Sequence, residues 1–142
     1  MLDRIDIQVE MPELSFSELS NTAPAESSAA IREKVERARE ISRRRFREAG
    51  FKDYASRSNA HLSTDELREF CALDEAGTEI MAGLFAKTNL SARGYDRILR
   101  VARTLCDLDS DGSTADGIIG GRIKKQHLME AAQMRILDRK YW

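Results

Sequence analysis

The sequence is short of cysteine and proline and has no long apolar run, and each shortage excludes a class of protein. Its 142 residues include two cysteines, Cys71 and Cys106, which are too few for a disulfide framework. Two prolines and eight glycines exclude a collagen-like chain. No window approaches the roughly 20 apolar residues that a membrane-spanning helix needs. The start of the chain also lacks the basic and apolar segments of a secretory signal, so a cytoplasmic location without a membrane partner is predicted.

The balance of charge excludes a globally basic nucleic-acid binder, because the net charge is −1. The charge is nevertheless uneven along the chain. Residues 1–27 carry six acids and one base, residues 28–48 carry eight bases and four acids, and residues 92–103 carry four arginines and one acid. The two cationic stretches are either solvated helix faces or surfaces that contact an anion or a partner.

The length suits one ordinary domain preceded by an extended segment. Ile5, Ile7 and Val9 alternate with polar residues, which predicts a half-buried strand over Leu2–Val9. Residues 12–27 hold both prolines and read as a linker, with a brief turn near Phe16 and Leu19. A lone strand cannot satisfy its own backbone, so its partners are expected to belong to another part of a larger protein. The predicted division is an arm over 1–27 and a helical domain over 28–142.

From Ser27 onward the apolar period becomes helical. Five helices are predicted, over about 28–48, from Ser63 through Phe70, over about 74–87, from Ser91 through Leu105, and over about 122–138. The segment from Ser63 to Glu66 has the spacing of a capping box. The first helix is expected to bury Ile31, Val35, Ala38, Ile41 and Phe46, and the third Ala76, Ile80, Met81, Leu84 and Phe85. The predicted fold class is all-α: a small bundle of about five helices, preceded by an extended arm with one orphan β-strand.

Three arginines share one face of the helix predicted from Ser91. Arg93, Arg97 and Arg100 are spaced i, i+4 and i+7, opposite the apolar positions. Arg93 lies in the first turn, where free backbone N–H groups and the helix dipole favour an anion. A guanidinium there is suited to a phosphate oxygen, although pairing with acids of the same chain is the other interpretation.

The basic helix over 28–48 allows two interpretations as well. Arg43, Arg44, Arg45 and Arg47 are suited to nucleic acid. The interleaved Glu33, Glu36 and Glu40 instead allow ion pairs along the helix.

The loop over 107–121 begins like a calcium-binding loop but does not end like one. Asp107, Asp109 and Asp111 are followed by Gly112, yet the last position holds Ile118 in place of the bidentate glutamate. A flexible acidic loop is therefore predicted, and no metal site. The histidines and cysteines have no zinc-ligand spacing, and no phosphate loop or nucleophile motif is present. Complete catalysis by this chain alone is not expected.

Three segments of the sequence together resemble the C-terminal part of magnesium-chelatase-like AAA+ ATPases of the competence (ComM) type. They are MLDRIDIQVEMPELSFSEL, ESSAAIREKVERAREISRRRF and the stretch from NAHLSTDELREFCALD to LSARGYDRILRVARTLCDL. The resemblance covers most of residues 2–108 and returns at 123–139, and LDRID and SARGYDRILRVARTL are its most specific parts.

The resemblance implies an AAA+ lid domain and a role for two arginines. Arg4 of LDRID resembles the arginine finger, which reaches ATP bound in a neighbouring subunit of a homo-oligomeric ring. Arg93 resembles the sensor-2 residue, which touches nucleotide from the lid of its own subunit. The implied cofactors are ATP and Mg²⁺ in a full-length parent, held by an N-terminal AAA+ core, with none bound tightly by this segment.

The implied activity is ATP-driven remodelling of DNA, such as branch migration in recombination or transformation. The lid of a magnesium chelatase motor, which acts in metal insertion into a porphyrin, is the first alternative. A stand-alone helical module that binds nucleic acid is the second.

Overall fold

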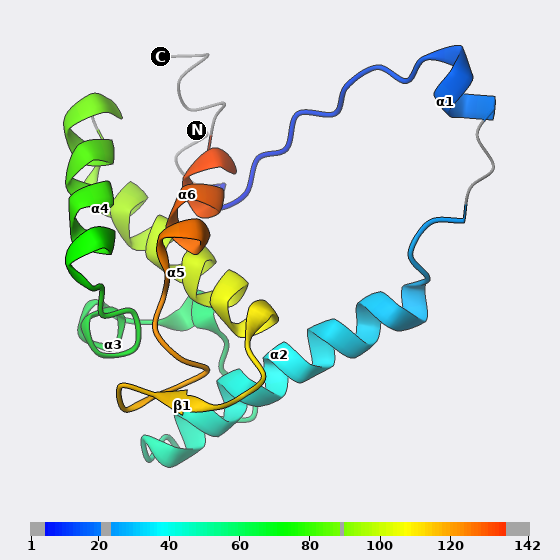
Figure 1. Ribbon diagram of the computed structural model, residues 1–142. Helices are drawn as coiled ribbons and strands as arrows, with labels where there is room; N and C mark the ends of the chain where they lie inside the picture. Colours follow the sequence, from blue (N-terminus) through cyan, green and yellow to red (C-terminus); the bar gives the residue numbers. More distant parts are fainter. Residues whose placement is uncertain (1–4, 21–23, 89, 136–142) are drawn as a thin grey trace.

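The computed structural model describes residues 5–20, 24–88 and 90–135, and it confirms the predicted small helical bundle (Figure 1). The helices are α1 (Phe16–Ser20), α2 (Ser28–Glu48), the 3₁₀ helix η2 (Asn59–His61), α3 (Thr64–Phe70), α4 (Glu75–Thr88), α5 (Ala92–Asp109) and α6 (Lys125–Gln133). Two short strands, β1 (Thr114–Ala115) and β2 (Ile118–Ile119), lie between α5 and α6. No helix within these ranges is both long and apolar enough to cross a bilayer.

Helix α5 is the centre of the bundle, because α2, α3, η2 and α6 all pack against it. Its periodic apolar residues, such as Ile98, Leu99 and Ala102, are buried. Around them pack Phe46 from α2, Phe70 from α3 and Leu128 from α6, all nearly inaccessible to water. The ring of Phe46 meets those of Phe51 and Phe70 edge to face, with centroids 5.9 and 6.0 Å apart.

Serine caps begin three of the helices at the positions that the sequence predicts. Ser63 accepts a hydrogen bond from the Glu66 amide, and the Glu66 carboxylate accepts one from the Ser63 amide, which completes the capping box. Ser27 caps α2 through the Ala30 amide, and Ser91 caps α5 through the Gly94 amide. These bonds satisfy amides that have no partner inside a helix.

Two of the predicted apolar stripes are only partly buried. In α2 the buried positions are Ala38, Ile41, Ser42, Arg45 and Phe46, whereas Ile31 remains 47% exposed. In α4 only Gly77 and Met81 are buried. The N-terminal half of α2 extends beyond the bundle, which explains the exposure of Ile31 (Figure 1).

The segment predicted as a flexible loop contains a tight β-hairpin. Thr114 pairs with Ile119 and Ala115 with Ile118, and the turn is formed by Asp116 and Gly117 with φ values of 53° and 77°. Positive φ at both central residues is typical of the two-residue hairpin turn that Asp-Gly favours. Ile118 and Ile119 are buried against the bundle, so the apolar part of this segment belongs to the core.

Helix α6 begins three residues later than predicted. Lys124 has extended backbone, with φ −98° and ψ 164°, and its amide donates to Nδ1 of His127 at 3.0 Å. This bond places the start of the helix at Lys125, while Ile123 is already buried in the core. The predicted C-terminal end of the helix lies outside the described residues.

The N-terminal arm is extended but forms no strand between residues 5 and 15. Ile5, Ile7 and Val9 are 45%, 50% and 67% exposed, whereas Gln8 between them is buried. The side predicted to be buried therefore faces outward, because no neighbouring strand is present among the described residues to cover it. The predicted turn near Phe16 and Leu19 is the short helix α1, which buries none of its residues.

Candidate functional site

The first turn of α5 combines a serine cap, a buried glycine and an exposed arginine. Ser91 Oγ accepts from the Gly94 amide at 3.0 Å, and the Ser91 carbonyl accepts from the Tyr95 amide at 2.9 Å. A Cβ atom on Gly94 would lie 2.7 Å from Cδ1 of Leu90, so glycine permits this close packing at the start of the helix.

Arg93 is exposed on this turn and makes no hydrogen bond or ion pair within the described part of the chain. Its guanidinium is therefore available to an external anion, beside the positive end of an 18-residue helix.

The other two arginines of the predicted face have partners in the same chain. Arg97 Nη1 lies 2.8 Å from Asp6 Oδ1. Arg100 donates to the Leu62 carbonyl through Nε at 3.3 Å and Nη2 at 2.8 Å. Pairing within the same chain, the other interpretation of this face, therefore holds for Arg97 through an acid and for Arg100 through a backbone carbonyl.

Arg4 lies outside the described residues, but the segment that follows it is attached to the end of the bundle. The Gln8 amide donates to the Met134 carbonyl at 2.7 Å, and Arg135 Nη1 donates to the Ile5 carbonyl at 3.2 Å. With the ion pair between Asp6 and Arg97, these contacts join the arm to both α5 and α6.

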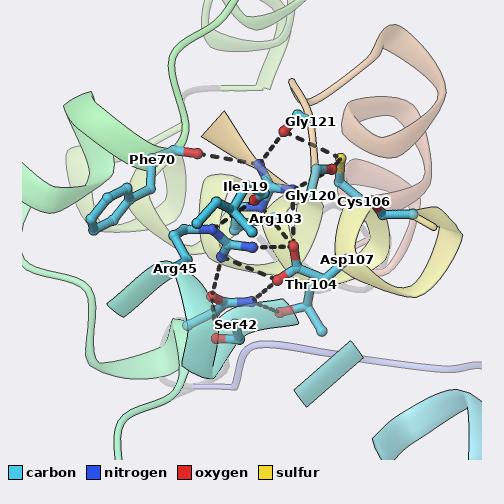
Figure 2. Close-up of polar contacts among 12 residues, drawn as sticks. Ser42, Arg45, Phe70, Arg103, Thr104, Cys106, Asp107, Ile119, Gly120 and Gly121 are labelled. Carbon is cyan, nitrogen blue, oxygen red and sulfur yellow. Dashed lines mark hydrogen bonds and ion pairs between the residues drawn. The ribbon is translucent and has the colours of Figure 1, made fainter. Parts of the chain in front are cut away.

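The sequence analysis missed a buried ionic network, shown in Figure 2, in which two arginines share one aspartate. Arg45 of α2 and Arg103 of α5 are 2% and 0% exposed, and Asp107 is 1% exposed. Asp107 Oδ1 accepts from Nη2 of Arg45 and, at 2.9 Å, from Nη2 of Arg103. Asn59 donates to Asp107 Oδ2 at 2.9 Å and so completes the surroundings of the carboxylate.

Backbone carbonyls accept the remaining hydrogen bonds of the two guanidinium groups. Arg103 donates to Gly121 O at 2.7 Å and to Gly120 O at 3.1 Å, and Arg45 donates to Ile119 O at 3.1 Å (Figure 2). Burial lowers the pKa of Arg45, while the Asp107 carboxylate acts in the opposite direction. Buried charges require this kind of saturation with partners, which indicates a structural role for the network.

Of the two interpretations of the basic helix, the structure favours pairing within the chain. Arg45 belongs to the core, and Arg44 donates to the Gly112 carbonyl at 2.8 Å. Arg39 and Arg43 lie 3.2 and 3.6 Å from carboxylate oxygens of Glu36 and Glu40. Pairs along the helix and contacts with other elements therefore account for part of the charge of α2.

The acids of the segment that resembles the start of a calcium-binding loop point to separate partners. Asp107 belongs to the buried network, Asp109 Oδ2 lies 3.1 Å from Nε2 of His127, and Asp111 Oδ1 accepts from the Ser113 amide at 2.8 Å. Over the described ranges, no three His, Cys, Asp or Glu side chains are grouped to hold a metal ion. The separation arises because Asp107 is still in α5, whereas the hairpin follows Asp111.

A cleft of about 720 Å³ lies between the hairpin and α6, with lining residues of both charges, including Asp109, Arg122 and His127. His127 Nδ1 accepts from the Lys124 amide, so the proton of the neutral ring is on Nε2, where it is donated to Asp109. Both ring nitrogens therefore have hydrogen-bond partners within the chain. Arg93 does not line this cleft.

Comparison with known proteins gives a consistent family. The family model described as magnesium chelatase, subunit ChlI C-terminal, matches residues 25–135. The chain is 35% identical over 139 residues to the uncharacterized protein YifB of Escherichia coli, covering 97% of this chain and 24% of that protein. It is 34% identical over 139 residues to the competence protein ComM of Haemophilus influenzae, with the same coverage. An uncharacterized protein of Mycobacterium bovis is 37% identical over 118 residues, covering 83% of this chain and 22% of its own.

The helical fold and these matches place the chain among magnesium-chelatase-like C-terminal domains. The chain belongs to the magnesium chelatase family, on the branch that includes ComM and YifB. It spans about a quarter of the length of the curated relatives it matches.

Proposed function

We propose that this chain is the lid of a ring-forming AAA+ ATPase and that Arg93 contacts the bound nucleotide as a sensor-2 residue. The observation that carries the proposal is the contrast among three arginines on one helix face. Arg97 and Arg100 have partners in their own chain, whereas Arg93 is exposed and without a partner in the described ranges.

The chemistry of Arg93 suits this role. A guanidinium offers two parallel hydrogen bonds to phosphate oxygens and remains charged at any physiological pH. Charge that develops on a transferring phosphoryl group is best stabilised by a fixed cation. The Ser91 cap and the close packing of Gly94 hold the backbone on either side of Arg93. ATP and Mg²⁺ are proposed to be bound by an N-terminal core of the same protein, with Arg4 as the finger toward a neighbouring subunit.

The proposed activity of the full-length protein is ATP-driven remodelling of DNA. This proposal is supported by the similarity of nearly the whole chain to a protein named for competence. Motion of the lid during the ATP cycle would move DNA through a ring of identical subunits.

The test compares Arg93→Ala with Arg68→Ala in the full-length parent. Arg68 is a matched control, because its side chain is 78% exposed and pairs only with Asp65 on the surface of α3. We expect Arg93→Ala to lower ATP turnover by about a hundredfold, as for loss of a preorganised cation, and Arg68→Ala to leave it unchanged. Equal turnover in the two variants would remove the sensor role.

A second readout of the same experiment addresses the substrate. Turnover by the unmodified parent is measured with and without a DNA four-way junction, and movement of the junction is followed by gel electrophoresis. We expect the junction to stimulate turnover and to migrate. The 142-residue chain alone is expected to hydrolyse no ATP.

The lid of a porphyrin-metallating motor is the second candidate, and the description of the matching family favours it. The two candidates share the role of Arg93 and differ in what stimulates the ATPase. A parent that ignores DNA but drives Mg²⁺ insertion into a porphyrin, together with the other chelatase subunits, would favour this second candidate.

A further inference from the structure

We infer that Arg97 is a positioning residue whose ion pair with Asp6 couples the N-terminal arm to the helix that presents Arg93. This inference rests on the proposed function, because the coupling matters only if Arg93 contacts nucleotide. We call the set of contacts formed by Asp6, Gln8, Arg97 and Met134 the arm clamp.

The arm clamp joins segments that are far apart in the sequence. Arg97 Nη1 lies 2.8 Å from Asp6 Oδ1, and the Gln8 amide donates to the Met134 carbonyl at 2.7 Å. One contact holds the arm to the first part of α5, and the other holds it to the end of α6. Residues 9–20 then leave the bundle, as Figure 1 shows, so the arm is attached to the helical domain at this place.

The position of Arg97 on α5 links the clamp to the candidate nucleotide contact. Arg97 follows Arg93 by four residues, so the two side chains lie on the same face, one turn apart. Between them the helix is continuous and its start is fixed by the Ser91 cap. A displacement of Asp6 is therefore transmitted through Arg97 to the turn that carries Arg93.

The ion pair between Asp6 and Arg97 is weak enough to open during a conformational change. The Arg97 side chain is 16% exposed, but its Nε and Nη1 are both buried without a hydrogen-bond partner among the described residues, so the contact of Nη1 with Asp6 is an ion pair only. Asp6 is 55% exposed, so the pair is weaker than the saturated network of Arg45, Arg103 and Asp107. Contacts of low local stability are the ones that move in conformational changes.

The first test measures the clamp without reference to nucleotide. Hydrogen exchange of the Gln8 amide is compared in the unmodified 142-residue chain, in Asp6→Ala and Arg97→Ala, and in the charge-swapped double variant Asp6→Arg/Arg97→Asp. We expect exchange to rise about two- to fivefold in the single variants, because one partly exposed ion pair is lost. The double variant should recover protection, and Arg68→Ala should leave it unchanged. Exchange that is unaffected by the single variants would overturn the clamp.

The second test measures coupling in the full-length parent. We expect Arg97→Ala and Asp6→Ala to lower kcat for ATP hydrolysis severalfold with the KM for ATP unchanged, and the charge-swapped variant to recover kcat. Faster exchange at Gln8 with an unchanged kcat would overturn the coupling while leaving Arg93 as the sensor. If instead Arg93→Ala has no effect on turnover, the proposed function fails, and the exchange result still reports on the clamp.

Discussion

At the scale of single residues, the partners of an arginine decide its role. Arg45 and Arg103 are buried around Asp107, and together with Asn59 and hairpin carbonyls they connect α2, α5 and the hairpin. Arg93 lies on the same helix as Arg103 and is exposed. Removing one partner from a buried ionic group leaves an uncompensated charge, so these residues are not interchangeable with surface arginines.

Both its backbone conformation and its close packing favour glycine at position 120. Its φ is +86°, and a Cβ there would lie 2.9 Å from both Asp107 Oδ1 and Ile41 Cγ2. Gly117 has a similar φ of +77° with no atom within 4 Å, which makes it a matched control. We expect Gly117→Ala to lower the free energy of unfolding by about 1 kcal/mol.

Gly120→Ala should lower the free energy of unfolding by about 1–3 kcal/mol more than Gly117→Ala, because overpacking disturbs the buried network as well. Urea denaturation of the two variants measures the difference. Equal losses would show that the network tolerates the added methyl group.

At the scale of secondary-structure elements, α5 carries a series of four arginines whose surroundings differ. Arg93 is exposed, Arg97 holds the arm, Arg100 binds the Leu62 carbonyl, and Arg103 is buried beside Asp107. The series passes from the exposed start of the helix into the core. One helix thus joins the candidate nucleotide contact to the structural network.

The start of α5 depends on its cap, which gives a prediction for Ser91. We expect Ser91→Ala to lower the free energy of unfolding by about 1 kcal/mol, because the Gly94 amide loses its acceptor. Ser91→Gly should cost only a few tenths of a kcal/mol, since glycine is itself a good capping residue. Thermal or urea denaturation distinguishes the two variants, and no loss in either would mean that the Ser91 side chain contributes little.

At the scale of the whole molecule, both cysteines report on the integrity of the core. Cys71 at the end of α3 and Cys106 of α5 are buried free thiols. Burial raises the pKa of Cys71 to about 12 and also raises that of Cys106. The thiolate is the reactive form, so neither side chain should react while the bundle is folded.

Ellman's reagent at pH 8 tests this prediction. We expect no fast reaction of the native chain and reaction of both thiols after unfolding in urea.

The raised pKa also predicts a pH dependence of the stability, because the unfolded Cys71 thiol ionises near pH 9.0 and the folded one near pH 12. Below pH 9 the thiol is neutral in both states, and the contribution of Cys71 to the free energy of unfolding is present in full. As the pH rises from 9 toward 12 the thiol ionises in the unfolded state only, so the free energy of unfolding falls by up to about 1.4 kcal/mol per pH unit. A Cys71→Ala variant should lack this part of the fall.

Local signals were sufficient to predict the helices and the capped start of α5. Ser63, Ser91 and the apolar period act within a few residues, and α2, α3 and α5 begin where these signals place them. The Asp116-Gly117 turn is also a local signal, because Asp-Gly strongly favours a two-residue hairpin turn. The sequence analysis did not predict this hairpin, because it interpreted the same segment as an incomplete calcium-binding loop.

The sequence by itself determined the helical class, the capped helix starts and the exposed Arg93, because propensity, capping and amphipathic period are local. Only the tertiary structure decided that Arg45 is buried, since its counter-ion Asp107 lies 62 residues away. It likewise decided that Arg97 pairs with Asp6 near the start of the chain, and that Ile5 and Ile7 face outward. A charged side chain is buried or bound according to partners that folding brings to it, and no local period records where those partners are.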